Sequence, residues 1–269
     1  MWSRQPASRR RTLARSMGRA TMNADAPLQA APERVLALLD ASRQSIAALA
    51  AAVELASRGR AELLALYIED QDLLDCAGFP FSREVGGRTG LARPLSMDSL
   101  TSTLRHQRLR ADEALRRAVA GRDIKHSLQV SRGRVVSETL AQAGPGDLLV
   151  LGKAGLAGQW GVRLGSTSRA LLLRAPCTVV IWDERQPLQP GPLRLYGDAE
   201  PLARLAPLFQ GLEQLPPMAA PALERHLTQA RGGALQLRRE ALQRLFREDP
   251  DLLGRVPVPV VVTDGAPSE

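Results

Sequence analysis

DLLVLGKAGLAGQWGVRLGS, residues 147–166, runs from an apolar stretch through a glycine-rich loop to the expected start of a helix. Gly152, Gly155, Gly165 and Ser166 give this segment the spacing G-x2-G-x9-G-S. At a strand-to-helix junction, unpaired backbone N–H groups and the positive end of a helix dipole favour an anion, and glycines let it approach the main chain. The segment therefore predicts a phosphate-binding loop, although it matches neither G-x-x-x-x-G-K-[ST] nor G-x-G-x-x-G.

The chain around this loop alternates short apolar runs with amphipathic stretches, the pattern of βα units around a parallel sheet. Strands are expected at residues 35–39, 63–68, 126–130, 147–151 and 178–182. Helices are expected at residues 42–57, where Gly59 ends the helix, and at 97–120, 135–143 and 166–174. We predict a doubly wound, Rossmann-like α/β fold with a parallel five-stranded sheet in the order 3-2-1-4-5. Residues 69–94 are rich in turn residues and predict a long irregular loop with one short helix near Leu73.

A sheet of this order binds ligands where the strand order reverses, between its first and fourth strands. Asp40 ends the first expected strand, and the glycine loop follows the fourth. The two should therefore be neighbours in space. Asp40 can accept a hydrogen bond from a base amino group or a ribose hydroxyl while the loop holds phosphates, so one adenine nucleotide would span both.

These residues resemble the universal stress protein family, whose ATP-binding branch carries G-x2-G-x9-G-[ST] followed by a helix and a proline-initiated strand. Asp40-Ala41-Ser42 is similar to the Asp-x-Ser that ends the family's first strand, and the resemblance covers about residues 34–183. It implies that Asp40 and Ile68 flank adenine. It also implies that ribose and phosphates are wrapped by Leu151, Gly152, Gly155, Gly165, Ser166 and Thr167.

Two features depart from the family pattern. Lys153 lies within the loop, and its ammonium either reaches a phosphate or is solvated. The insertion at residues 69–94 is longer than in compact family members. It forms a lid over the nucleotide, a partner surface, or a solvated loop anchored by Phe79 and Phe81, the last being favoured.

A degenerate copy of the first module is predicted in the residues that follow that module. LLLRAPCTVVIWD, residues 171–183, aligns without gaps on LLGRVPVPVVVTD, residues 252–264, with seven identical positions. Residues 193–196 and 234–237 are expected counterparts of strands one and four, with Asp198 near the expected aspartate. Arg238-Arg239-Glu240 occupy the positions that correspond to Gly152 and the start of the glycine loop. This copy should therefore not bind phosphates. Independent similarity of two proline-initiated strands is the alternative interpretation.

We therefore predict a nucleotide-binding module at residues 34–184, a linker at 185–192, a truncated second module at 193–264 and a short tail at 265–269. Residues 178–182 and 258–262 should lie side by side, each covering the other's open edge. They would do so as a pseudo-dimer within one chain or between the two chains of a homodimer.

The net charge of +8 is concentrated in one tail, because the first 20 residues hold six arginines and no acidic residue. Residues 1–33 should form a disordered basic tail, and Met22 is a plausible alternative start. An arm for nucleic acid or for a membrane surface is the less favoured interpretation. No secretory signal or membrane-spanning run is evident, so the expected location is the cytoplasm.

The chain shows no catalytic or metal-binding constellation. Its two cysteines and three histidines lack ligand spacing, and no motif of a hydrolase, an ATP pyrophosphatase or a nucleotidyl transferase is present. We expect a non-enzymatic stress-response or regulatory protein that binds ATP, with or without Mg²⁺, and acts on an unidentified protein partner. Slow ATP hydrolysis would be incidental. The alternative is a partner-binding module with a vestigial nucleotide site, in which residues 69–94 make the contact.

Overall fold

The computed structural model describes residues 34–86, 89–153, 164–182 and 190–264. Residues 34–182 are called the first half below, and residues 190–264 the second half. The expected basic tail, the C-terminal tail and most of the glycine loop, including Gly155, lie outside the described residues.

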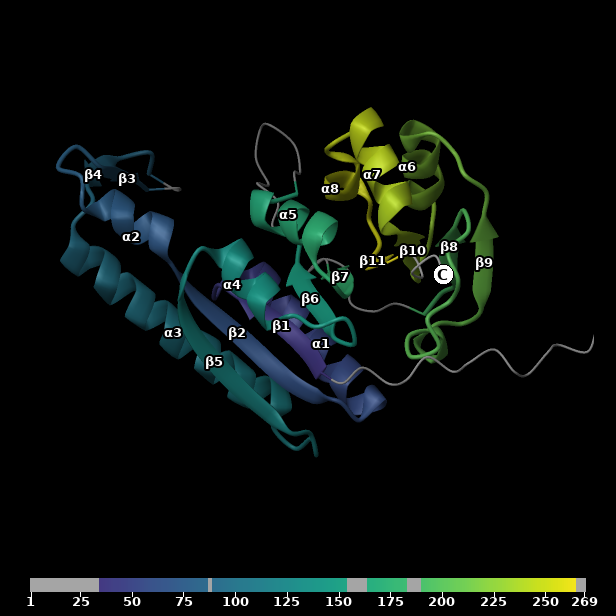
Figure 1. The fold of residues 1–269 in the computed structure, drawn as a ribbon, viewed down its shortest axis with the longest axis horizontal. Helices are drawn as coiled ribbons and strands as arrows, with labels where there is room; N and C mark the ends of the chain where they lie inside the picture. The colour runs from purple at the N-terminus through teal and green to yellow at the C-terminus, as the bar shows by residue number, and fades with distance from the viewer. Residues whose placement is uncertain (1–33, 87–88, 154–163, 183–189, 265–269) are drawn as a thin grey trace, which may run out of the picture.

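The first half contributes five parallel strands to a nine-stranded sheet, in the order β5-β2-β1-β6-β7 (Figure 1). This is the predicted order 3-2-1-4-5. The strands are β1 (Arg34–Leu39), β2 (Glu62–Asp70), β5 (His126–Gly133), β6 (Leu148–Gly152) and β7 (Thr178–Trp182). Their connecting helices are α1 (Arg43–Gly59), α3 (Met97–Val119), α4 (Val135–Gln142) and α5 (Ser166–Arg174).

The second half continues the same sheet in the order β11-β10-β8-β9. Its strands are β8 (Leu193–Tyr196), β9 (Leu212–Leu215), β10 (Ala234–Arg238) and β11 (Val260–Thr263). Its helices are η1 (Ala206–Leu208), α6 (Ala220–Thr228), α7 (Arg239–Glu248) and α8 (Leu252–Arg255). β11 pairs antiparallel with β7, so the two strands expected to lie side by side do so within the chain. The division into separate domains stays a prediction, since one sheet runs through both halves.

The insertion is more regular than the sequence indicated. Residues 69–70 extend β2, and α2 (Gln71–Ala77) matches the expected short helix. An antiparallel hairpin of β3 (Arg83–Val85) and β4 (Ala92–Pro94) then replaces the predicted irregular loop. Gly90 has a φ of 64° and its N–H donates to the carbonyl of Gly86, so these glycines shape a hairpin turn.

The C-terminal end of α1 also differs from the prediction. Gly59 is the last helical residue, and Arg60 takes the left-handed conformation with a φ of 51°. The N–H of Arg60 satisfies carbonyls of the last helical turn, the role that glycine more often fills.

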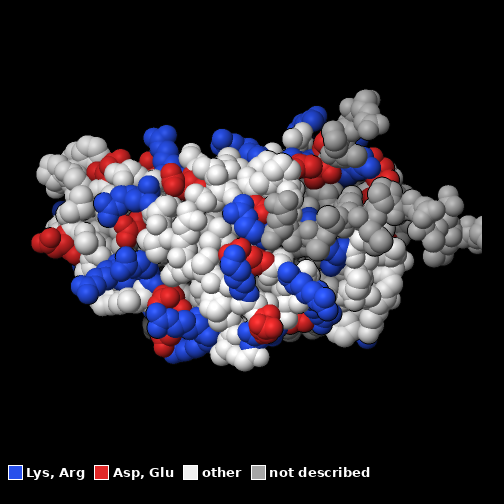
Figure 2. Space-filling view, turned by 60° about the horizontal axis from the view of Figure 1, so that its bottom comes forward, with Lys and Arg blue, Asp and Glu red and all other residues white. Residues whose placement is uncertain are grey.

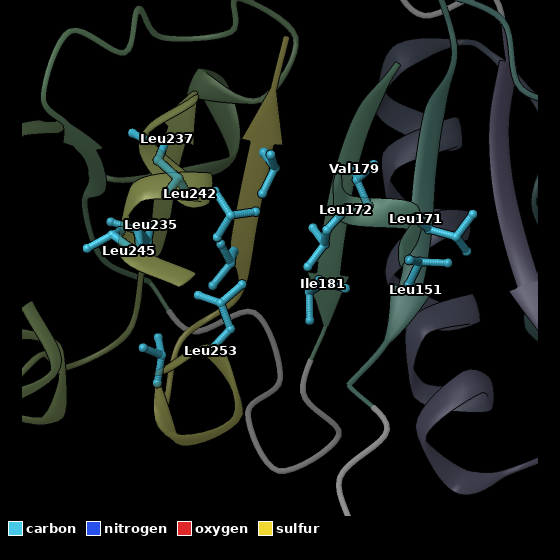
Figure 3. Packing of buried hydrophobic residues seen from close by; sticks show 14 of the residues in the cluster. Leu151, Leu171, Leu172, Val179, Ile181, Leu235, Leu237, Leu242, Leu245 and Leu253 are labelled. Atoms are coloured by element: carbon cyan, nitrogen blue, oxygen red, sulfur yellow. The ribbon is translucent and has the colours of Figure 1, made fainter. Parts of the chain in front are cut away.

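Apolar side chains fill both faces of the sheet. On one face, Leu149 and Ile181 of the first half share a cluster with Leu235 and Leu242 of the second, under α4 to α8. Figure 3 shows Leu172 and Ile181 facing Leu242 and Leu253 across the junction of β7 and β11. The other face is covered by α1, α3 and residues 202–209. The two halves therefore share one continuous core.

Charged side chains are mixed on the surface. On the face shown in Figure 2, basic and acidic side chains are interspersed. Several described charges form ion pairs, such as Arg132 with Glu69. Such pairs contribute little stability because water screens them. That face therefore presents no continuous basic stripe among the described residues.

Candidate nucleotide site

A pocket of about 400 Å³ opens at the carboxyl ends of β1, β2 and β6. It lies at the predicted switch point, where β1 and β6 are neighbours. The structure brings together every described residue of the predicted site. These are Asp40, Ile68, Leu151, Gly152, Gly165, Ser166 and Thr167. Gly155 is the predicted residue that the structure does not describe.

The turn after β1 is tightly built. Oδ1 of Asp40 accepts a hydrogen bond from the N–H of Ser42 at 2.9 Å, and Ser42 caps α1 by accepting from the N–H of Ser45 at 3.1 Å. Ala41, between them, has a φ of 59°, a conformation that costs a non-glycine residue about 1 kcal/mol or more. The turn therefore holds the Asp40 carboxylate and the start of α1 in fixed positions at the pocket wall.

Gly152 has a packing role beside its place in the glycine pattern. A Cβ atom there would lie 2.6 Å from the carbonyl carbon and oxygen of Gln44 and 2.8 Å from the nitrogen of Ser45. The absence of a side chain lets the first turn of α1 press against the end of β6. That contact places α1 and β6 on adjoining walls of the pocket.

Helix α5 begins at the opposite wall. Gly165 is its N-cap residue, and no side chain caps the helix. The first helical hydrogen bond runs from Arg169 to Gly165, so the N–H groups of Ser166, Thr167 and Ser168 have no helical acceptor. An uncapped helix N-terminus that lines a pocket suits a phosphate group.

The other end of the pocket is more apolar and includes residues that the sequence reasoning missed. Tyr67 donates a hydrogen bond to the carbonyl of Leu104 at 3.1 Å, and its hydroxyl lies 3.4 Å from Oε1 of Gln107. Burial, followed by the charge of Glu69, raises the pKa of Tyr67 above its ordinary value. Leu104 and Gln107 sit three positions apart on α3, but no local pattern indicates that this helix face closes a pocket on β2.

The structure contradicts both expectations for Lys153. Its side chain is 6% exposed, so it is not solvated, and Nζ donates to the backbone carbonyl of Val256 in the second half. It does not line the pocket. The described lining contains two carboxylates, Asp40 and Asp70, and no lysine or arginine.

Other titratable groups lie away from the pocket. Asp147 directly precedes β6, at the end of the strand away from the pocket, and Arg34 contacts its carboxylate at 2.7 Å. Cys177 is buried, and burial raises the pKa of its thiol to about 11. Within residues 34–86, 89–153, 164–182 and 190–264, no group of three or more His, Cys, Asp or Glu side chains is placed to hold a metal ion.

The strand order defines a Rossmann-like α/β protein, and its switch-point pocket is lined in part by the N-terminus of α5. The family model of the universal stress protein family matches residues 32–182. The chain belongs to the universal stress protein family.

Solved structures extend the likeness over the second half. A universal stress protein from Archaeoglobus fulgidus is 13% identical, with a TM-score of 0.55 over 87% of this chain and 98% of its own. A functionally unknown protein from Pseudomonas aeruginosa is 11% identical, with a TM-score of 0.52 over 88% of this chain and 94% of its own. At these identities both show the fold alone.

A universal stress protein from Lactobacillus plantarum is 24% identical and covers 56% of this chain and 97% of its own, with a TM-score of 0.41. A search of curated proteins finds no significant match. Among the described residues, no helix has the length and apolar character that crossing a bilayer requires.

Proposed function

We propose that this chain is a stress-response or regulatory protein that binds an adenine nucleotide, ATP in the first place, in the pocket between β1 and β6. One observation carries the proposal. The switch-point pocket gathers Asp40, Ile68 and the uncapped start of α5 on its walls. A carboxylate, an apolar surface and N–H groups that lack a helical acceptor are the partners that a ribose or base, an adenine ring and a phosphate need.

The nucleotide would lie across the pocket with its base toward Ile68 and Tyr67 and its phosphates toward Ser166 and Thr167. No basic side chain lines the described pocket, so neutral N–H and hydroxyl donors would hold the phosphates. Mg²⁺ bound with ATP would reduce the repulsion between the phosphates and the nearby carboxylates of Asp40 and Asp70. Gly155 would complete the phosphate contacts.

The proposed role is binding rather than catalysis. Two carboxylates and several hydroxyls line the pocket, but a nucleophile paired with a general base is not among the described contacts. Slow hydrolysis of bound ATP would be incidental to a role in which the nucleotide alters what the surface offers a partner. We propose the cytoplasm as the site of action.

Equilibrium dialysis of labelled ATP against the full chain tests the proposal. We expect saturable binding below 1 mM, about −4.1 kcal/mol or better. Gly165→Asp should abolish it, because a carboxylate at the N-cap repels phosphate while still capping α5. Gly165→Asn is the matched control, since it caps the helix without the charge and should retain more binding. Absence of saturable binding below 1 mM, or equal binding by native chain and Gly165→Asp, would refute the proposal.

A second candidate function, partner binding through residues 69–94, is favoured by the exposed apolar surface of the insertion. Phe79 and Phe81 stack with ring centroids 5.6 Å apart and are 52% and 78% exposed. Val85 and Leu91 of the hairpin segment are 64% and 69% exposed. Exposed apolar side chains gathered in one segment are typical of interaction sites. Two results together would favour this second function. The native chain would bind no ATP, and Phe81→Ser would lose a cellular partner that the native chain binds.

A further inference from the structure

The two halves meet about a pseudo-two-fold axis. In the alignment of residues 171–183 on residues 252–264, Val180 corresponds to Val261. These two valines pair with each other in the antiparallel ladder of β7 and β11. On either side of them, Val179 pairs with Val262 and Ile181 pairs with Val260, so the pairing is unchanged when the two strands are interchanged. A symmetric junction of this kind brings equivalent surfaces of the two halves into contact, as in a two-fold dimer.

Two buried cationic side chains, one from each half, donate hydrogen bonds to the opposite half across this junction. Lys153 follows the last residue of β6, and Arg239 follows the last residue of β10, so they hold equivalent places. They are 6% and 7% exposed. Lys153 donates to the carbonyl of Val256, while Arg239 donates to the carbonyls of Leu172 and Cys177, the latter at 3.0 Å. We call Lys153 and Arg239 the reciprocal clasp.

The acceptors explain why these cations are stable when buried. Leu172 lies in the last turn of α5, where carbonyls lack helical donors, and Val256 is the C-cap residue of α8. Positive charge at the C-terminal end of a helix is favourable, and hydrogen bonds offset the cost of burying it. Asp264 adds a carboxylate that accepts from Nε of Arg239 at 2.6 Å.

Helix α5 is held a second time by α7. The guanidinium of Arg169 lies 4.9 Å from the ring centroid of Phe246, within the range of a cation–π contact. The second half thus holds α5, whose N-terminus lines the pocket, from its C-terminal end and from its side. It also holds Lys153, which directly follows pocket residue Gly152.

We propose that the second half positions the phosphate end of the nucleotide site through Lys153 and Arg239, as positioning residues that do not touch the nucleotide. This inference rests on the proposed function. The second half lacks the glycines for a site of its own, and the clasp gives this truncated copy a role in supporting the site of the first half.

The test compares ATP with adenosine, because the clasp acts at the phosphate end. Dissociation constants for both are measured on the full chain with Lys153→Met and Arg239→Met, after circular dichroism shows them folded. We expect ATP affinity to fall about tenfold, which corresponds to about 1.4 kcal/mol, and adenosine affinity to change less than about twofold. Arg239→Lys should restore part of the ATP affinity, since an ammonium can still donate to the carbonyls.

Lys125→Met is the matched control, because Lys125 is the chain's other lysine and makes an exposed ion pair with Glu62. It should bind ATP as the native chain does. Unchanged ATP affinity in the two clasp variants, or equal losses for ATP and adenosine, would overturn the inference and leave nucleotide binding intact. A native chain that binds no ATP would instead refute the proposed function and this inference with it. If the methionine variants fail to fold, Arg239→Lys provides the test. We expect this variant to bind ATP more weakly than the native chain and adenosine equally well. Equal changes in the affinities for ATP and adenosine would contradict the inference.

Discussion

Replacing Gly152 by alanine tests the close approach of α1 to β6 that shapes the pocket. The new Cβ would lie 2.6 Å from two backbone atoms of Gln44 and 2.8 Å from the nitrogen of Ser45. Ordinary contacts begin at 3.4 Å, so the first turn of α1 has to move by roughly 0.8 Å in a densely packed region. Backbone atoms cannot turn aside as a flexible side chain can.

The expected loss of stability is modest but measurable. Overpacking of a core costs about 1–3 kcal/mol, and an alanine regains about 0.4–1 kcal/mol by restricting the unfolded chain. We expect a net decrease of about 1–2 kcal/mol in the free energy of unfolding, or roughly 2–4 °C in Tm per kcal/mol for a chain of this size. ATP affinity should also fall, because Ser42 and Ser45 of the displaced turn line the pocket.

Urea unfolding and calorimetric ATP titration measure the two effects. Gly144→Ala is the matched control, since a Cβ there meets only Oδ2 of Asp147 at 3.5 Å, an ordinary contact. It should raise the unfolding free energy by about 0.4–1 kcal/mol, through the same restriction of the unfolded chain, and leave ATP affinity unchanged. A Gly152→Ala chain at least as stable as the native one, with native ATP affinity, would refute the reasoning.

Three further predictions concern regions outside the pocket. Because burial raises the pKa of Cys177 to about 11, folding favours its thiol form, and the unfolding free energy should fall by roughly 2 kcal/mol as the pH rises from 9.0 to about 11. Cys177→Ala should make this decline shallower, and an unchanged pH profile would contradict the assignment. Arg34→Met leaves the buried carboxylate of Asp147 without its ion pair, so urea unfolding should show a loss of about 1–3 kcal/mol while ATP affinity is retained. Phe81→Ser should change neither stability, within about 0.5 kcal/mol, nor ATP affinity, since the ring is 78% exposed; a loss of either would place it in the core or the site.

The sequence predicts the first half well because four of its five strands, β1, β2, β6 and β7, are buried on both faces and read as apolar runs. The bounds of α5 and β7 match the prediction, and the strand order follows from the alternation of strands and helices. The hairpin of β3 and β4 was missed because its strands are three residues long and lie largely exposed, so no alternation marks them.

The sequence predicts those site residues whose positions follow from the order of strands along the chain. It does not predict residues that reach the pocket only through tertiary packing. Asp40 and Gly152 end neighbouring strands, so topology brings them together. Gln107 joins them only because α3 packs against β2, which no local pattern encodes. The partner of Lys153 is 103 positions away, and an amine after a glycine gives no local sign that it will be buried.

A crystal structure of the full chain grown with a non-hydrolysable ATP analogue tests the central claim most directly. We predict one nucleotide per chain, with its base beside Asp40 and Ile68 and its phosphates at the N–H groups of Ser166 and Thr167. Density for the analogue at another site, or an empty pocket at a saturating concentration of the analogue, would contradict the account.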